Sequence, residues 1–124
     1  MLKNLPVVTF VPTTQFTRAR DFYEQTLGLP LVSQDDFALV FALSHASLRV
    51  VKVEAFTPAP FTILGWDVPS MDAGLKTLSA KGVTFQRYPF MDAGSDAWTS
   101  PSGAKVAWFK DPDGNTLSLT EHPR

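Results

Sequence analysis

Hydrophobic and polar positions along the first half of the chain predict a strand followed by a helix. The stretch Leu5–Pro12 is rich in Val, Thr and Phe, a composition typical of a strand. Apolar residues then recur at helical spacing, at Phe16, Ala19, Tyr23 and Leu27. Thr13 or Thr14 can cap this helix, because a side-chain oxygen there accepts an unpaired N–H. Gly28 is placed to end it, since glycine best tolerates the left-handed backbone that follows many helices.

Three strand-like runs complete the first half, at Leu29–Gln34, Phe37–Leu43 and Leu48–Glu54. Charged or small polar residues separate them, as expected of turns between strands. The proline-rich segment Pro58–Pro60 then separates this half from the rest of the chain.

The second half begins the same order again. Phe61–Val68 has the composition of a strand, and Ser70 can cap a helix that Gly82 ends. The expected extended runs that follow are Val83–Tyr88, Ala97–Thr99 continuing into Lys105–Lys110, and Thr116–Glu121. We expect Pro89–Asp96 to be a mobile loop, and D-P-D-G at Asp111 to form a β-turn. The sequence therefore predicts an α+β fold of two tandem βαβββ modules, spanning residues 1–57 and 61–124.

Composition narrows the class of protein. A chain of 124 residues with 44% hydrophobic residues is long enough to bury a real core, as one compact domain or as two small fused modules. The net charge of −1, with Lys and Arg scattered, argues against nucleic acid as a partner. The longest apolar run, Phe37–Leu43, is too short to span a bilayer, so we expect no membrane partner. With no cysteine and no apparent secretory signal, a cytoplasmic location is the default expectation.

Two local motifs sit within this repeated order. The first is A-R-D-F-Y-E-Q-T-L-G-L at residues 19–29, and the second is F-K-D-P-D-G-N-T-L-S-L at residues 109–119. Together with the element order, they resemble the vicinal oxygen chelate (VOC) superfamily. That group includes glyoxalase I, extradiol dioxygenases, fosfomycin-resistance enzymes and bleomycin-resistance proteins. The whole chain, residues 1–124, thus resembles a single glyoxalase/bleomycin-resistance-like domain.

The resemblance implies that the two curled sheets form a cup with the helices outside. It also implies a homodimer, because family members are usually homodimers. The cup can close within one chain or across the dimer, and the sequence leaves this choice open.

Metal-dependent members of the superfamily carry up to four His, Glu or Gln ligands on the inner face of the cup. Carried over by position, the first-strand ligands fall on Val8 and on Ile63, or on Thr62 if the register slips by one. The last-strand ligands fall on Lys52, with Glu54 next on the same face, and on Ser118. None of the four aligned side chains is a strong donor for a divalent cation. We therefore expect no metal and no cofactor.

Other residues are candidates for contact with a small molecule. Lys52, if it faces inward, can pair with an anionic ligand, and Ser118 can supply a hydroxyl group. Trp98 is the leading aromatic candidate because it lies beside the expected loop, and Phe10 shares a face with Val8. Two further aromatic candidates are Phe41 and Tyr88. By alternation from Ile63, Trp66 is expected to face the helix layer.

These residues lead to competing hypotheses of function. The first is a metal-independent small-molecule-binding protein, of the sequestration or resistance type, with an unknown ligand. The second is an isomerase or lyase in which Lys52 acts as a base or electrostatic stabiliser. A metal-dependent glyoxalase-like or dioxygenase-like enzyme remains if the ligand positions are carried over in the wrong register. A fourth possibility is an accessory subunit with no ligand cavity.

Overall fold

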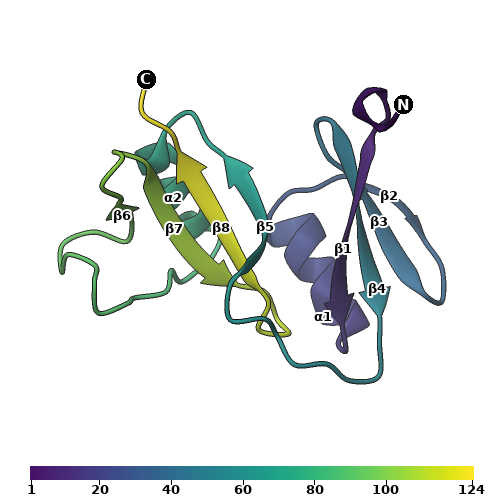
Figure 1. Cartoon of the computed structure of the whole chain (residues 1–124). Helices are drawn as coiled ribbons and strands as arrows, with labels where there is room; N and C mark the ends of the chain where they lie inside the picture. The colour runs from purple at the N-terminus through teal and green to yellow at the C-terminus, as the bar shows by residue number, and fades with distance from the viewer. The chain divides into compact units, whose positions relative to one another are not determined.

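The computed structural model describes all residues, 1–124, and they form two compact units, Met1–Thr57 and Pro58–Arg124. Each unit contains one four-stranded mixed sheet and a helical segment against it (Figure 1). Neither sheet closes into a barrel. In both units the element order is strand, helix, three strands, so the α+β fold of two βαβββ modules is confirmed.

The strands of unit 1 lie in the order β1-β4-β3-β2. The unit starts with a short 3₁₀ helix, η1 (Leu2–Asn4), and its strands are β1 (Val7–Thr13), β2 (Leu31–Gln34), β3 (Ala38–Ala42) and β4 (Ala46–Lys52). The first and last strands, β1 and β4, pair in parallel at one edge of this order, and the other pairs are antiparallel. This pairing joins the first and last strands of the unit, and the helical segment lies between these strands in the sequence.

The core of unit 1 lies between the sheet and this helix. Val11, Leu39 and Val50 stand side by side on neighbouring strands and are fully buried. Tyr23 of the helical segment is also fully buried, and its ring centroid lies 6.0 Å from that of Phe41. Alternate positions on each strand therefore face the helix, as the period of a half-covered strand requires.

The helical segment of unit 1 begins later than the sequence predicts. Thr13 is the last residue of β1, and its hydroxyl accepts a hydrogen bond from the Gln15 N–H at 3.0 Å, so the helix α1 (Phe16–Arg20) starts after Gln15. The segment continues as π-helical turns, η2 (Asp21–Thr26). Gly28 follows with φ +74°, a conformation that costs glycine little, and so ends the helix as predicted.

The strands of unit 2 lie in the order β5-β8-β7-β6. Its elements are β5 (Thr62–Asp67), α2 (Met71–Ala80), β6 (Trp98–Thr99), β7 (Lys105–Lys110) and β8 (Thr116–Glu121). The predicted strand Val83–Tyr88 is wrong: only one bridge forms there, between Phe85 and Phe109. A chain that meets the edge of β7 at this single point and then turns away cannot form a ladder of hydrogen bonds.

The helix α2 is fixed at its N-terminus by two side chains. Ser70 is the N-cap, as predicted, and its hydroxyl accepts a hydrogen bond from the Ala73 N–H at 3.2 Å. The Glu121 carboxylate, at the end of β8, accepts the Met71 N–H at 2.7 Å. Gly74 lies against the side chain of Leu119, so the helix packs closely on β8. No helix of the chain combines the length and the apolar sequence needed to cross a membrane.

The turn between β7 and β8 is the predicted β-turn. The Gly114 N–H donates to the Asp111 carbonyl at 3.0 Å, and Gly114 has φ +87°. The buried Asp111 carboxylate accepts the backbone N–H groups of Asp113 and Asn115 at 3.0 and 2.9 Å. The Asn115 side chain donates to the same carboxylate at 2.9 Å. This network fixes the register of the hairpin that carries Ser118.

Candidate functional site

Each sheet has one face covered by its own helix and one opposite face, which we call the open face. In unit 2, Ala107, Phe109, Leu117 and Leu119 are buried on the helix side. The alternate residues Trp108 and Ser118 are direct partners across the β7–β8 ladder and point to the open face. Trp66 pairs with Leu119, so it lies on the helix side, where alternation predicted it.

Four aromatic rings gather on the open face of unit 2. We call them the aromatic cluster: Tyr88, Phe90, Trp98 and Trp108. The rings of Tyr88 and Phe90 are stacked with centroids 5.6 Å apart. Trp98 and Trp108 are tilted at 6.1 Å, and Tyr88 meets Trp108 edge to face at 5.4 Å. Separations of this size are those at which aromatic pairs attract each other. The sequence candidates Tyr88 and Trp98 are thus brought together.

Backbone contacts position the aromatic cluster. The Gln86 N–H donates to the Trp108 carbonyl at 2.7 Å, which holds the segment before Tyr88 against β7. The Met91 N–H then donates to the Tyr88 carbonyl at 3.0 Å, which forms a tight turn with Phe90 at its tip. Met91 is buried, and the Arg87 guanidinium contacts both the Asp92 carbonyl and the Asp96 carboxylate. The expected loop Pro89–Asp96 therefore makes contacts with the segment before it at Met91, Asp92 and Asp96.

Polar groups lie on the same face of unit 2. Ser118 is 6% exposed, and its Oγ lies against the backbone of Gly65 on the neighbouring strand. Lys110 pairs with Thr116 at the turn end of the ladder, and its Nζ donates to the Thr116 hydroxyl at 2.6 Å. At the other end, His122 Nε2 lies 3.1 Å from the Asp67 carboxylate. The open face thus carries one lysine near the aromatic cluster and a paired His–Asp at its far end.

The open face of unit 1 is more apolar. Phe10 lies beside Arg49, which in turn lies beside Val40. Phe10 is 60% exposed and Val8, on the same face, is 44% exposed. Phe10 therefore shares the open face with Val8, as the sequence predicted, and its ring is accessible.

Two sequence candidates are placed differently from the expectation. Phe41 is fully buried against Tyr23 in the core of unit 1, because it pairs with Leu48 on the helix side. Lys52 follows Val50 on that same side of β4, and its Nζ lies 6.0 Å from the Phe16 ring at the start of α1. Strand β4 starts at Ala46, two residues before the predicted Leu48. Because side chains alternate along it, Arg49 and Val51 point to the open face and Lys52 does not.

The positions that the resemblance assigns to metal ligands do not fit a divalent cation. In unit 1 they hold an apolar side chain, Val8, and a lysine on the helix side, Lys52. In unit 2 a β-bulge lies between Thr62 and Leu64, and Thr62 is the residue that pairs with Thr116. A threonine there and the Ser118 hydroxyl replace the imidazole and carboxylate donors that such ions prefer. Nor does the chain hold a group of three or more His, Asp or Glu residues arranged for a metal.

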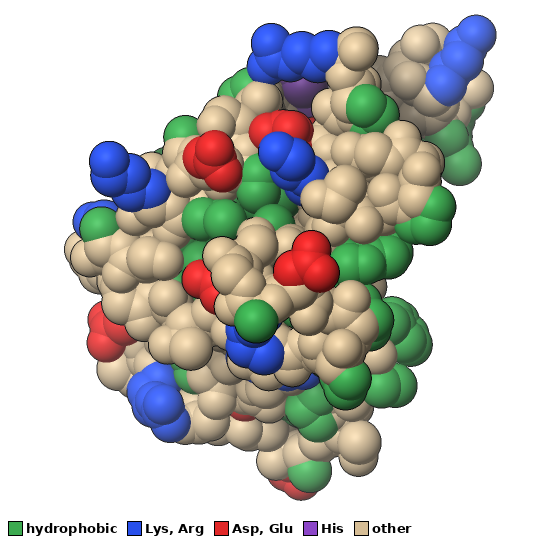
Figure 2. All heavy atoms as spheres, turned by 90° about the vertical axis from the view of Figure 1, so that its left-hand side faces the viewer, with side chains coloured by type: hydrophobic (Ala, Val, Ile, Leu, Met, Phe, Trp, Pro, Cys, Tyr) green, Lys and Arg blue, Asp and Glu red, His purple; other side chains and the backbone are tan.

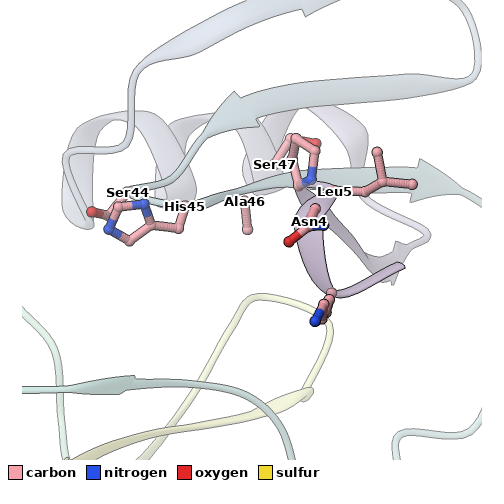
Figure 3. Close-up of a pocket in the computed structure, with 8 residues that line it drawn as sticks. Asn4, Leu5, Ser44, His45, Ala46 and Ser47 are labelled. Carbon is pink, nitrogen blue, oxygen red and sulfur yellow. The ribbon is translucent and has the colours of Figure 1, made fainter. Parts of the chain in front are cut away.

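A groove of about 520 Å³ lies elsewhere on unit 1, between η1 and the β3–β4 turn (Figure 3). Its lining comes from two short segments, residues 3–6 and 44–47. His45 and Asn4 lie on opposite sides of Ala46 in this view. Since these side chains are mostly exposed, the groove is an open surface feature and contains none of the site residues expected from sequence.

The charged side chains on the side of unit 2 that carries the loop before β6 do not indicate a ligand of either sign. Figure 2 shows Lys, Arg, Asp and Glu side chains interspersed with hydrophobic groups on this side, without a large area of one sign. A mixed surface of this kind is not the positively charged stripe that nucleic-acid binding requires.

Sequence reasoning missed three residues of the open face of unit 2: Trp108, Phe90 and Lys110. Trp108 and Lys110 could have been found, because a hairpin centred on Pro112–Gly114 places them opposite Ser118 and Thr116. Pro89 is a local signal for the turn before Phe90, but no pattern in the sequence indicates that this turn stacks Phe90 on Tyr88.

The fold is that of a two-module βαβββ protein, and comparison with known proteins identifies its family. A sequence model of the Glyoxalase/Bleomycin resistance protein/Dioxygenase superfamily matches residues 6–119, so the chain belongs to that superfamily. No curated protein matches the sequence.

Solved structures of the same fold cover nearly the whole chain. A superfamily member from Sphaerobacter thermophilus DSM 20745 has a TM-score of 0.73 at 23% identity, covering 98% of this chain and 100% of its own. A lactoylglutathione lyase from Agrobacterium tumefaciens has a TM-score of 0.73 at 15% identity, covering 95% and 93%. A member from Nocardioides has a TM-score of 0.73 at 18% identity, covering 94% and 82%. Identities this low establish the shared fold and leave the activity open.

Proposed function

We propose that this protein binds a small organic molecule on the open face of unit 2 without using a metal ion. The observation that carries the proposal is the aromatic cluster beside Ser118, on the face opposite α2. Rings that lie on a sheet face next to a few polar groups are the usual lining of a small-molecule site.

Metal independence is supported by the chemistry of the side chains at the four carried-over positions. A valine, a lysine, a threonine or isoleucine, and a serine offer no imidazole or carboxylate. Chemistry that requires a bound divalent cation therefore has no donor set at these positions. The proposal extends to sequestration or resistance as the biological role, by analogy with bleomycin-resistance members of the superfamily.

No observation favours an enzyme that uses Lys52. Its ammonium group lies over the Phe16 ring on the helix side of β4, away from the open face of unit 1. A homodimeric state is part of the proposal and rests on the superfamily resemblance. A cytoplasmic location is also part of it and rests on the sequence features given above.

A fluorescence screen tests the proposed function. In a Trp66→Phe variant the remaining emission comes from Trp98 and Trp108, which both belong to the aromatic cluster. We expect ligands from a library of small aromatic molecules to quench this emission, and protein treated with a chelator to bind them equally well. Binding that is lost on chelation and restored by Zn²⁺ or Mn²⁺ would contradict the proposal.

Phe90→Ala and Trp66→Phe form a matched pair for the location of the site. Phe90 is 58% exposed at a turn, so its truncation should leave the fold intact. We expect it to weaken binding about tenfold, since stacking of one ring is worth about 1 kcal/mol or more. Trp66→Phe, on the helix side, should leave affinity unchanged. Equal affinity in both variants would place the ligand elsewhere.

A further inference from the structure

We propose that the ligand of unit 2 is an aromatic carboxylate, or a close relative with a flat ring and one anionic group. This inference rests on the proposed function and specifies its ligand class. It is drawn from the position of Lys110 relative to the aromatic cluster, which neither the fold nor the comparisons address.

The ring of the ligand is matched by the two tryptophans. Trp98 pairs with Val106, two residues before Trp108 on β7, and the planes of Trp98 and Trp108 meet at an angle of 31°. Together they make a broad, shallowly angled aromatic surface. Phe90, at the tip of its turn, meets Trp98 edge to face at 5.3 Å and remains mostly exposed. An added flat ring can extend this arrangement by the same stacked or edge-to-face contacts.

The anionic group is matched by Lys110. It lies two residues from Trp108 on β7, so both side chains point to the open face with their Cα atoms about 7 Å apart. The Lys110 ammonium donates to the Thr116 hydroxyl, and none of the chain's ion pairs involves it. An ammonium has three donors, so it can bind a carboxylate while keeping this bond.

The other charges of this face do not compete for the anion. Asp67 is engaged with His122 at 3.1 Å, at the opposite end of β8 from Lys110. Hydroxyl groups of Thr116 and Ser118 line the row on β8 between Lys110 and that pair. A ligand carboxylate near Lys110 therefore meets a cation and the hydroxyl groups of this row.

A cationic aromatic ligand fits this face less well. Aromatic rings attract cations through their faces, but the rings of Tyr88 and Phe90 already pack perpendicular to Trp108, with centroids 5.4 and 6.1 Å from it. Lys110 would also repel a second positive charge. The arrangement thus discriminates by charge between ligands that share the same ring.

The experiment compares three ligands with one ring system by calorimetry: 2-naphthoate, the neutral 2-naphthamide, and the 2-naphthylmethyl ammonium ion. We expect the carboxylate to bind about tenfold more tightly than the amide, the scale of one charge-assisted hydrogen bond. Lys110→Met should remove this preference, and Lys110→Arg should keep it. Raising the salt concentration should reduce the preference, because the pair is partly exposed.

Lys105→Met is the matched control. Lys105 is on the same strand, but on the other face, and it pairs with Glu121 at 4.0 Å. Its loss should leave the preference for the carboxylate intact. Equal affinity for carboxylate and amide in the unaltered protein, or equal effects of the two Lys→Met variants, would overturn the ligand class while the proposed function stands. If no member of the wider aromatic library binds, both the ligand class and the proposed function fail.

Discussion

The Ser118 hydroxyl lies over the backbone of Gly65, its partner across the β5–β8 ladder. A Cβ atom placed on Gly65 would come within 2.9 Å of Ser118 Oγ and 3.3 Å of the Ser118 carbonyl oxygen. Real Cβ atoms do not approach an oxygen so closely, so the glycine is required by the position of the hydroxyl. Glycine usually weakens the interior of a strand. At position 65 it is needed because there is no space for a Cβ atom beside Ser118.

Gly65→Ala should therefore destabilise unit 2. We expect a loss of about 1–2 kcal/mol in the free energy of unfolding, the usual cost of overpacking. Ser118→Ala removes Oγ, the nearer of the two atoms, so the double variant should recover part of the loss. Denaturant unfolding of the two single variants and the double variant measures this coupling. Strictly additive effects would show that the two side chains do not meet.

The bond from the Met71 N–H to Glu121 predicts a second stability effect. This carboxylate lies at the N-terminus of α2, where unpaired N–H groups and the helix dipole both favour an anion. Glu121→Ala should lower the free energy of unfolding by about 1 kcal/mol, and Glu121→Gln by less, because the amide oxygen can still accept the bond.

The control for this prediction is the partner of Glu121 in an exposed ion pair. Lys105→Met breaks the 4.0 Å contact with Glu121 and should cost less than about 0.5 kcal/mol. A larger loss in Lys105→Met than in Glu121→Ala, measured by thermal unfolding, would assign the effect to the ion pair instead of the helix terminus.

The turn between β2 and β3 predicts a dependence of stability on pH. The backbone N–H groups of Phe37 and Ala38 donate to the Asp35 carboxylate, each at 2.8 Å, and they hold its pKa below the usual value, with a smaller contribution from Arg49. A carboxyl with a lowered folded-state pKa stabilises the fold fully above its ordinary pKa of about 3.9. That stabilisation is lost as the pH falls through the lower folded-state value.

Asp35→Asn should remove this component, because an amide does not titrate but can still accept both hydrogen bonds. Melting curves between pH 2 and pH 6 should show a smaller decrease in stability at low pH for Asp35→Asn than for the unaltered protein. Asp36→Asn, in the same turn, serves as the control and should retain the Asp35 component. Identical pH profiles for the unaltered protein and Asp35→Asn would refute the assignment.

The sequence predicted the order of elements well because local signals coincide with tertiary ones. Ser70 caps α2, Gly28 ends the first helical segment, and D-P-D-G makes a tight turn, each for a reason contained in a few neighbouring residues. The strand after that turn has the predicted bounds, Thr116–Glu121. Alternation from it correctly directs Ser118 to the face opposite the helix.

The features that the sequence did not predict correctly depend on contacts between residues that are distant in the chain. Val83–Tyr88 has a strand-like composition, but only Phe85 forms a β-bridge, and the chain then turns at Pro89. The face on which Lys52 lies follows from the register of β4 with β1, which composition does not determine. Phe41 was named for its ring, and its burial follows from its contact with Tyr23 across the core.

The most direct measurement of the central claim is ligand binding to protein freed of metal. After treatment with a chelator, with metal content verified by mass spectrometry, the Trp66→Phe variant should bind an aromatic small molecule with quenching of Trp98 and Trp108 emission. Phe90→Ala in the same background should weaken that binding about tenfold. Binding that requires a divalent cation, or that is unchanged by Phe90→Ala, would contradict the claim that the aromatic cluster of unit 2 is a metal-independent binding site.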